Sequence, residues 1–105
     1  MAGKMSKAEF RRRFPVGTRC RARWVGIVNS LKDCEWHERE ITVQKTSAMY
    51  SKILTGPKAG GQPMSDWSGV KRIEEIEDGI LVFYAKHNDS PFMQIKPGES
   101  HAVQN

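Results

Sequence analysis

The segment TRCRARWV, residues 18–25, has the clearest alternation of apolar and charged side chains in the sequence. Its even positions are apolar and its odd positions are basic: Cys20, Ala22 and Trp24 alternate with Arg19, Arg21 and Arg23. Successive side chains of a strand point to opposite faces, so we expect a strand with one buried face and a row of arginines in solvent. Neighbouring arginines in that row would lie roughly 7 Å apart, close to the spacing of phosphates along one nucleic-acid strand.

A short helix is expected just before this strand, over residues 7–13. Ser6 and Glu9 have the S-x-x-E form of a capping box, in which each side chain accepts a hydrogen bond from a backbone N–H at the helix start. Phe10 and Phe14 are four residues apart and therefore fall on one face of the helix. The proline that follows disfavours the helical conformation in the residue before it, which ends the helix.

The clearest hairpin lies in the second half of the chain. Residues 70–77 and 80–85 flank Asp78 and Gly79, the dipeptide favoured in type I′ turns. The second arm begins with ILVFY and is almost continuously apolar. Such a run predicts a central strand that is covered on both faces.

The remaining segments are less regular. Residues 38–46 alternate again and are expected to be a strand, and residues 92–96 a short final strand. Residues 48–54 have a spacing that fits a helical turn and a strand about equally well, so both interpretations stay open. Residues 56–66 (GPKAGGQPMSD) contain three glycines and two prolines and are expected to be a long exposed loop.

These elements predict a mainly β (α+β) fold. A chain of 105 residues has room for one core. A short N-terminal helix and about five short antiparallel strands pack best as a small, partly open barrel, SH3-like or OB-like. We expect residues 6–96 to form this single domain, with a flexible leader at residues 1–5 and a flexible tail at residues 97–105. Barrels of this class serve many unrelated functions, so the fold alone does not identify the activity.

The composition indicates a protein of the cytoplasm. No apolar run approaches the ~20 residues that a membrane-spanning helix needs, and the basic N-terminus lacks the apolar stretch of a signal peptide. Cys20 and Cys34 are too few for the disulfide framework of a small secreted domain. We therefore expect a cytoplasmic protein that makes no contact with a membrane.

The positive charge is concentrated near the N-terminus. The net charge is +5, but residues 1–24 contain eight basic residues and one acidic residue, a net charge of +7. Residues 25–105 contain nine basic and eleven acidic residues, a net charge of −2. A field polarised in this way attracts anionic partners, of which nucleic acid is the simplest.

The predicted nucleic-acid-binding residues combine the arginines with two tryptophans and a loop lysine. They are Arg11, Arg12, Arg13, Arg19, Arg21, Arg23, Trp36, Lys58 and Trp67. The planar guanidinium matches phosphate oxygens bidentately, and exposed tryptophan rings can stack on bases. Trp36 and Trp67 border loops and polar residues, which favours their exposure over that of Trp24, although core packing is the commoner state of a tryptophan.

The arginine row also has a purely structural interpretation. Its side chains could pair across the sheet with acidic residues, such as Glu38, Glu40, Glu74 and Glu75. Surface pairs of this kind are common and contribute little to stability, ~0–1 kcal/mol. Because the arginine row and the basic helix are adjacent in sequence and add to one field, both interpretations are retained.

No catalytic or metal-binding motif stands out, so we expect no enzyme, cofactor or small-molecule substrate. Cys34 and His37 have the spacing of zinc ligands, and Cys20, His87 or His101 could add to them, but a second ligand pair is missing. A cysteine–histidine dyad for nucleophilic catalysis is conceivable in any chain with these residues.

The leading hypothesis is therefore a non-catalytic module that contacts the backbone of DNA or RNA through an arginine-rich N-terminal face. The alternative is a small accessory or inhibitor protein of the bacteriophage type. Such a protein would dock the same basic face on an acidic host or partner protein.

Overall fold

The computed structural model describes residues 3–15, 17–25, 30–43, 48–60, 64–84 and 90–96. These residues form one antiparallel sheet of eight strands in the order β1-β6-β7-β8-β2-β3-β4-β5. The elements are β1 (Gly3–Met5), α1 (Lys7–Arg13), β2 (Thr18–Trp24), the 3₁₀ turn η1 (Leu31–Asp33), β3 (His37–Val43), β4 (Ala48–Ile53), β5 (Met64–Asp66), the 3₁₀ turn η2 (Trp67–Gly69), β6 (Val70–Ile76), β7 (Gly79–Tyr84) and β8 (Met93–Ile95). The mainly β class with one helix is confirmed, with more strands than the expected five.

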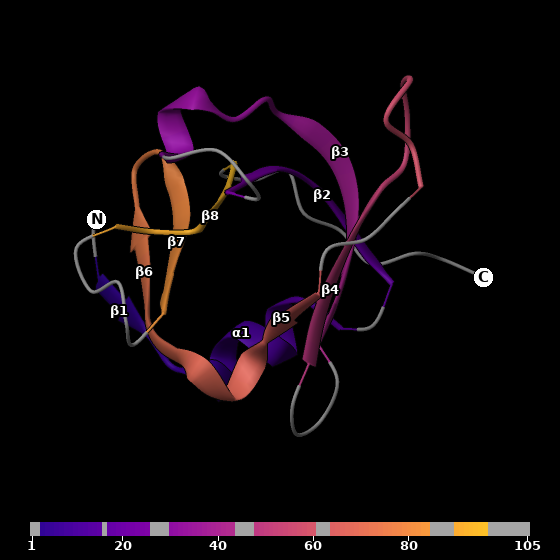
Figure 1. The fold of residues 1–105 in the computed structure, drawn as a ribbon. Helices are drawn as coiled ribbons and strands as arrows, with labels where there is room; N and C mark the ends of the chain where they lie inside the picture. Colours follow the sequence, from indigo (N-terminus) through magenta and orange to yellow (C-terminus); the bar gives the residue numbers. More distant parts are fainter. Residues whose placement is uncertain are drawn as a thin grey trace.

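The sheet curls round on itself without closing (Figure 1). Its end strands, β1 and β5, do not pair with each other in the described part of the chain. The chain nevertheless runs directly from β5 through η2 into β6, so a single turn links one end strand to the strand next to the other end strand. Helix α1 lies beside this turn in Figure 1, and its apolar face packs there.

Helix α1 forms for the reasons that its sequence indicates. The Ser6 hydroxyl accepts a hydrogen bond of 3.0 Å from the backbone N–H of Glu9, which satisfies one of the free donors at the helix start. The rings of Phe10 and Phe14 are both buried, with centroids 4.4 Å apart. Residues 3–5, at the end of the expected leader, form β1 and pair with β6. The expected tail, residues 97–105, lies outside the described residues.

The burial of β2 follows the predicted alternation. Thr18, Cys20, Ala22 and Trp24 are buried, and the arginines between them point outward. Residues 48–53 are a strand, β4, which settles the choice between helix and strand. Within the expected loop at residues 56–66, the last three residues form β5 and pair with β4.

The β6–β7 hairpin is confirmed, but its two-residue turn is Glu77–Asp78, one residue earlier than the predicted Asp78–Gly79, because Ile76 pairs with Gly79. Asp78 also lacks the positive φ that a type I′ turn needs. Glycine is instead required at the first residue of β7. Gly79 has a φ of +120°, and a Cβ at this position would lie 1.8 Å from the backbone oxygen of Ile95 on β8.

Strand β7 lies between β6 and β8, as expected of a central strand; Ile80, Val82 and Phe83 are buried and Leu81 is half-buried. Val82 packs in the core, whereas Phe83 is buried on the opposite face beneath the Arg72 guanidinium, 4.0 Å from its ring centroid.

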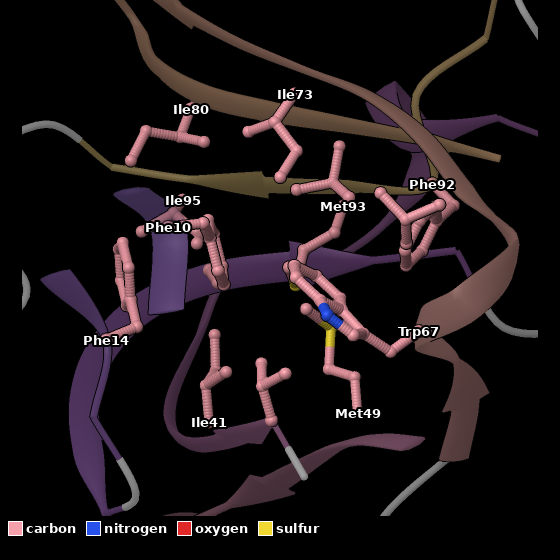
Figure 2. Close-up of a cluster of buried hydrophobic side chains, with 14 of the residues drawn as sticks. Phe10, Phe14, Ile41, Met49, Trp67, Ile73, Ile80, Phe92, Met93 and Ile95 are labelled. Carbon is pink, nitrogen blue, oxygen red and sulfur yellow. The ribbon is translucent and has the colours of Figure 1, made fainter. Parts of the chain in front are cut away.

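The core fills the interior of the curled sheet with side chains from α1, η2 and most strands. Figure 2 shows this core and labels ten of its members, which are Phe10, Phe14, Ile41, Met49, Trp67, Ile73, Ile80, Phe92, Met93 and Ile95. Strand β8 is short but central. It joins the half-sheet β1-β6-β7 to the half-sheet β2-β3-β4-β5, and all three of its residues are buried.

Candidate nucleic-acid interface

The outward face of β2 carries the three arginines that the sequence places there. Arg19 and Arg21 are exposed, and Arg23 is half-buried. Their common orientation follows from the strand geometry, since alternate residues share a face. The row is therefore a surface feature that a partner can reach.

The strands on either side of β2 add charges of both signs. Glu40 and Glu38 on β3 lie opposite Arg19 and Arg21 in the register. Beyond them Lys52 on β4 lies opposite Glu40, and the backbone N–H of Lys96 donates to the Arg21 carbonyl. We call this surface the arginine face; its five basic and two acidic side chains are Arg19, Arg21, Arg23, Lys52, Lys96, Glu38 and Glu40.

The acidic residues do not neutralise the arginine row by direct pairing. Among the described side chains, neither Glu38 nor Glu40 comes within ion-pair distance of Arg19 or Arg21. The predicted cross-strand pairs are thus in register but not in contact. Five basic groups against two acids leave the face with an excess of positive charge.

Trp36 lies at one end of the arginine face. Strand β3 starts at His37, opposite Ala22, which brings the preceding tryptophan beside Arg23. The Arg23 Cζ lies 4.8 Å from the centroid of the Trp36 ring, and the Lys96 Nζ lies 4.9 Å from it. The ring is half-buried. The structure thus joins an aromatic side chain to the basic row, as the sequence prediction requires.

A glutamine holds Arg23 in this position. The Nε and Nη2 groups of Arg23 donate to the Gln94 Oε1 over 3.0 and 2.8 Å. The Gln94 Nε2 in turn donates to the Asp78 carbonyl over 3.0 Å. Gln94 is buried, so this chain of hydrogen bonds ties the guanidinium to the β6–β7 turn.

Lys58 reaches the segment before Trp36 from the β4–β5 connection. Its Nζ lies 3.4 Å from the Glu35 Oε1, which also lies 3.5 Å from the His37 Nε2. Burial lowers the pKa of His37, and the charge of Arg39 lowers it further, so this imidazole is mainly neutral at pH 7. Lys58 thus lies near the candidate site, but its ammonium group pairs with the Glu35 carboxylate.

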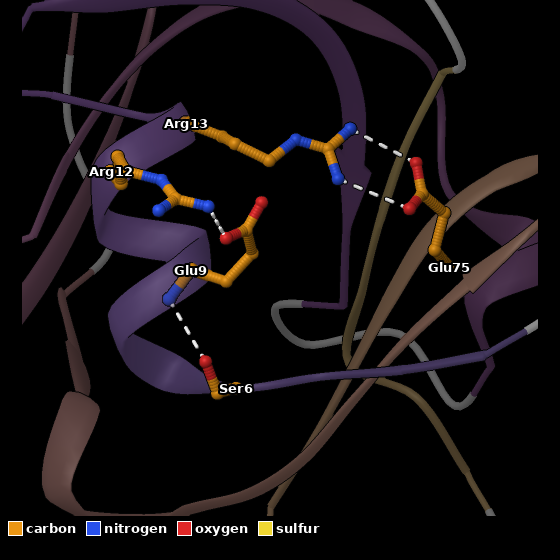
Figure 3. Close-up of polar contacts among 5 residues, drawn as sticks. All are labelled: Ser6, Glu9, Arg12, Arg13 and Glu75. Carbon is orange, nitrogen blue, oxygen red and sulfur yellow. Dashed lines mark hydrogen bonds and ion pairs between the residues drawn. The ribbon is translucent and has the colours of Figure 1, made fainter.

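The helix arginines differ from those of β2, because two of them are paired with carboxylates (Figure 3). Arg12 contacts Glu9 one turn earlier. Arg13 binds Glu75 of β6 bidentately, over 3.1 and 2.9 Å, and this contact lowers the pKa of the Glu75 carboxyl. Arg11 is exposed and makes no ion pair with a described residue.

Arg11 and Arg12 line a shallow hollow of about 360 Å³ with the end of β3. Its other lining residues are Ala8, Phe14, Pro15 and Val43. Arg13, by contrast, points to β6. The three helix arginines are thus divided between two directions and do not extend the β2 row as one continuous surface.

Trp67 is not exposed, although it is among the predicted nucleic-acid-binding residues. Its residue exposure is 3%, and its ring lies 5.3 Å from that of Phe10 in the core. Lys7 covers it from outside, with Nζ donating to the Trp67 carbonyl over 2.9 Å. The loop-like neighbours of Trp67 belong to η2, the turn that links β5 to β6, which is why polar residues flank a core side chain.

Arg39 is a buried cation that the sequence prediction missed. It lies on the inner face of β3 with an exposure of 4%. Its Nε donates to the Ala22 carbonyl over 3.2 Å and its Nη1 to the Ser51 Oγ over 2.8 Å. Burial lowers its pKa. The parity of Ile41 and Val43 places residue 39 inward, so the signal was present in the sequence.

The thiols give no sign of a reactive or metal-binding site in the described residues. Burial raises the pKa of Cys20 to about 12, so its thiol stays protonated at neutral pH. The half-buried Cys34 thiol donates to the Ser30 carbonyl. Within the described ranges no three histidine, cysteine or acidic side chains gather closely enough for a metal ion. His87 and His101 lie outside those ranges.

The helices in the described part of the chain are all too short or too polar to cross a membrane. No known family model, curated protein or solved structure matches the chain. A proposal for its function therefore has to rest on the surface chemistry described above.

Proposed function

We propose that the chain is a non-catalytic module that binds the backbone of nucleic acid through the arginine face. The single observation that supports this most is the row of Arg19, Arg21 and Arg23 on one face of β2, where no described carboxylate pairs with them. Arginines spaced by two strand residues match the repeat of phosphates along a strand.

The physical basis of binding is electrostatic. Guanidinium groups donate two parallel hydrogen bonds to phosphate, and each contact releases counterions from the nucleic acid. Contacts of this type position a protein but do not read base sequence, so the binding is sequence-tolerant. Arg11 and the other helix arginines contribute to the field that attracts the ligand, whereas the contacts themselves form on β2 and β8.

The proposed fold class fits this role. We interpret the curled, unclosed sheet as a small, partly open barrel of the SH3-like or OB-like kind, working in the cytoplasm. OB-like barrels bind oligonucleotides on their strand faces. The fold is nonetheless shared by many functions, and the proposal therefore rests on the arginine face.

A second candidate is an accessory or inhibitor protein that docks this face on a partner protein. The observation in its favour is the presence of Glu38 and Glu40 within the face, directly opposite two arginines. A mixed pattern of charges suits a protein surface with complementary acids and bases, whereas carboxylates repel phosphates. An acidic host protein of the type that a bacteriophage protein targets would be such a partner.

Fluorescence anisotropy distinguishes the two candidates. Labelled single-stranded DNA, duplex DNA and structured RNA are titrated with the protein at several salt concentrations. We expect salt-dependent binding whose slope of log K against log salt falls by about 2–3 in an R19A/R21A/R23A variant. An R11A/R12A/R13A variant, with the same loss of charge, is the matched control and should keep most of the slope. Absence of binding to all three nucleic acids would reject the proposal.

A further inference from the structure

The three tryptophans differ in one respect that matters for recognition. Trp24 and Trp67 are buried, whereas Trp36 is half-buried and lies on the arginine face. Two cations of that face, Arg23 and Lys96, lie within 5 Å of its ring centroid. Trp36 is thus an aromatic ring placed among the groups proposed to hold phosphates.

The cations around the ring retain hydrogen-bonding capacity. The contacts of Arg23 with Gln94 use its Nε and Nη2, and its Nη1 donates to no described residue. The Lys96 Nζ likewise makes no hydrogen bond or ion pair with a described residue. Both groups can therefore donate to phosphate oxygens while Gln94 keeps the Arg23 guanidinium in place.

A surface cation–π contact is weaker than the stacking of a base on tryptophan. A ligand that offers both an unstacked base and flanking phosphates can therefore replace the Lys96 contact with the ring. The base takes the ring face, and the ammonium moves to a phosphate. A duplex cannot do this, because its bases are stacked and paired in its interior.

We infer that the ligand of the arginine face is single-stranded nucleic acid, with one base stacked on Trp36 and the adjacent phosphates bound by Arg21, Arg23 and Lys96. This inference rests on the proposed function and specifies its ligand class. An aromatic platform within a basic surface is the combination by which proteins bind single strands without sequence preference.

The test uses the intrinsic fluorescence of the protein and a pair of variants. Oligo-dT, oligo-rU and a duplex of the same length are titrated at low salt. Because Trp24 and Trp67 are buried, a change in tryptophan emission on binding reports chiefly on Trp36. We expect quenching by both single strands, and little change with the duplex even where the duplex binds.

The variants separate stacking from packing. Trp36→Leu keeps apolar bulk without a ring and is expected to weaken single-strand binding about tenfold, with an unchanged salt slope because no charge is lost. Trp36→Phe keeps a ring and is expected to stay within about threefold of the wild type. Circular dichroism establishes that both variants are folded, and the quenching experiment on the wild type does not depend on either of them.

The outcomes distinguish this inference from the proposed function. Equal affinity for single strand and duplex, with no effect of Trp36→Leu, would overturn the inference and leave backbone binding intact. Single-strand binding without quenching would overturn it as well. If the wild type binds no nucleic acid at any salt concentration, the proposed function itself fails.

Discussion

Helix α1 and strand β2 each carry three arginines, and the first arginine of the strand comes only six positions after the last of the helix. The two sets nevertheless lie in different environments. Consecutive residues of a helix are rotated by about 100° from one another, so Arg11, Arg12 and Arg13 spread around its axis. Two of them bind carboxylates, one of which is 62 residues away in sequence. Alternate residues of a strand share a face, and the β2 arginines therefore form one surface. A count of basic residues does not distinguish these cases, but the periodicity does.

The comparison implies that the face on which an arginine lies determines its role. The largest expected effect is on stability, from substitution of the buried Arg39. Arg39→Ala removes a buried side chain and leaves the Ser51 hydroxyl without its partner. We expect the free energy of unfolding to fall by about 3 kcal/mol in urea denaturation. Arg39→Met, which keeps the volume without the charge, should lose less. Equal losses in the two variants would show that the hydrogen bonds, and not the volume, stabilise the site.

Charge reversal on β2 and on α1 tests the comparison directly. Arg21→Glu and Arg11→Glu change the net charge equally, and neither residue pairs with a described carboxylate. We expect Arg21→Glu to weaken oligonucleotide binding about 30-fold, a loss of ~2 kcal/mol, because it removes a phosphate contact. Arg11→Glu should weaken it about threefold through the long-range field alone. Equal effects, measured by anisotropy at one salt concentration, would mean that binding depends only on net charge.

Removal of the two carboxylates within the arginine face should change oligonucleotide affinity less than Arg21→Glu does, and should raise it instead of lowering it. A Glu38→Gln/Glu40→Gln variant should bind oligonucleotides about threefold to tenfold more tightly, because two charges that repel phosphate are removed. A Glu9→Gln/Glu75→Gln variant, which removes two carboxylates that pair with arginines of α1, serves as the control for the same change in net charge. A weaker complex in the Glu38→Gln/Glu40→Gln variant would instead favour a protein partner whose basic groups use these carboxylates.

The ion pair between Arg13 of α1 and Glu75 of β6 gives the smallest expected effect, a change in the free energy of unfolding. Arg13 lowers the pKa of Glu75, so the carboxylate stabilises the fold above its unfolded pKa of about 4.3 and loses this contribution as the pH falls through its folded value. Both side chains are partly exposed, so Glu75→Gln should lower the free energy of unfolding by about 0.5 kcal/mol at pH 7. Urea denaturation should show this difference fading below about pH 4. A difference that persists there would have another cause.

The elements that local patterns define could be predicted from the sequence. The capped helix, the alternating β2 and the β6–β7 hairpin all depend on residues close together in the chain. Strand β1 could not be predicted, because a segment of three residues becomes a strand only by pairing with β6, far along the chain. The same holds for β5, which forms within a glycine- and proline-rich segment by pairing with β4.

The candidate site was predictable to a similar degree. The periodicity of β2 placed its arginines outward, which the structure confirms. It did not reveal that Lys96 would join Trp36 and Arg23, because that meeting depends on the position of β8 between β7 and β2. Trp67 was included among the binding residues because its neighbours are polar, but η2 turns its ring into the core, the commoner state of a tryptophan. Arg39 could have been found from the parity of β3.

The central position of β8 has a consequence for folding during synthesis of this protein. A chain emerging from the ribosome can expose strands of both half-sheets before residues 93–95 appear, but it cannot join them. Arg23 and Gln94, which meet across that junction, are 71 residues apart. Pairings over such separations form slowly, and until they do the edges of β2 and β7 are open to strands of other chains. The addition of β8 to the sheet therefore determines when aggregation ceases to compete with folding.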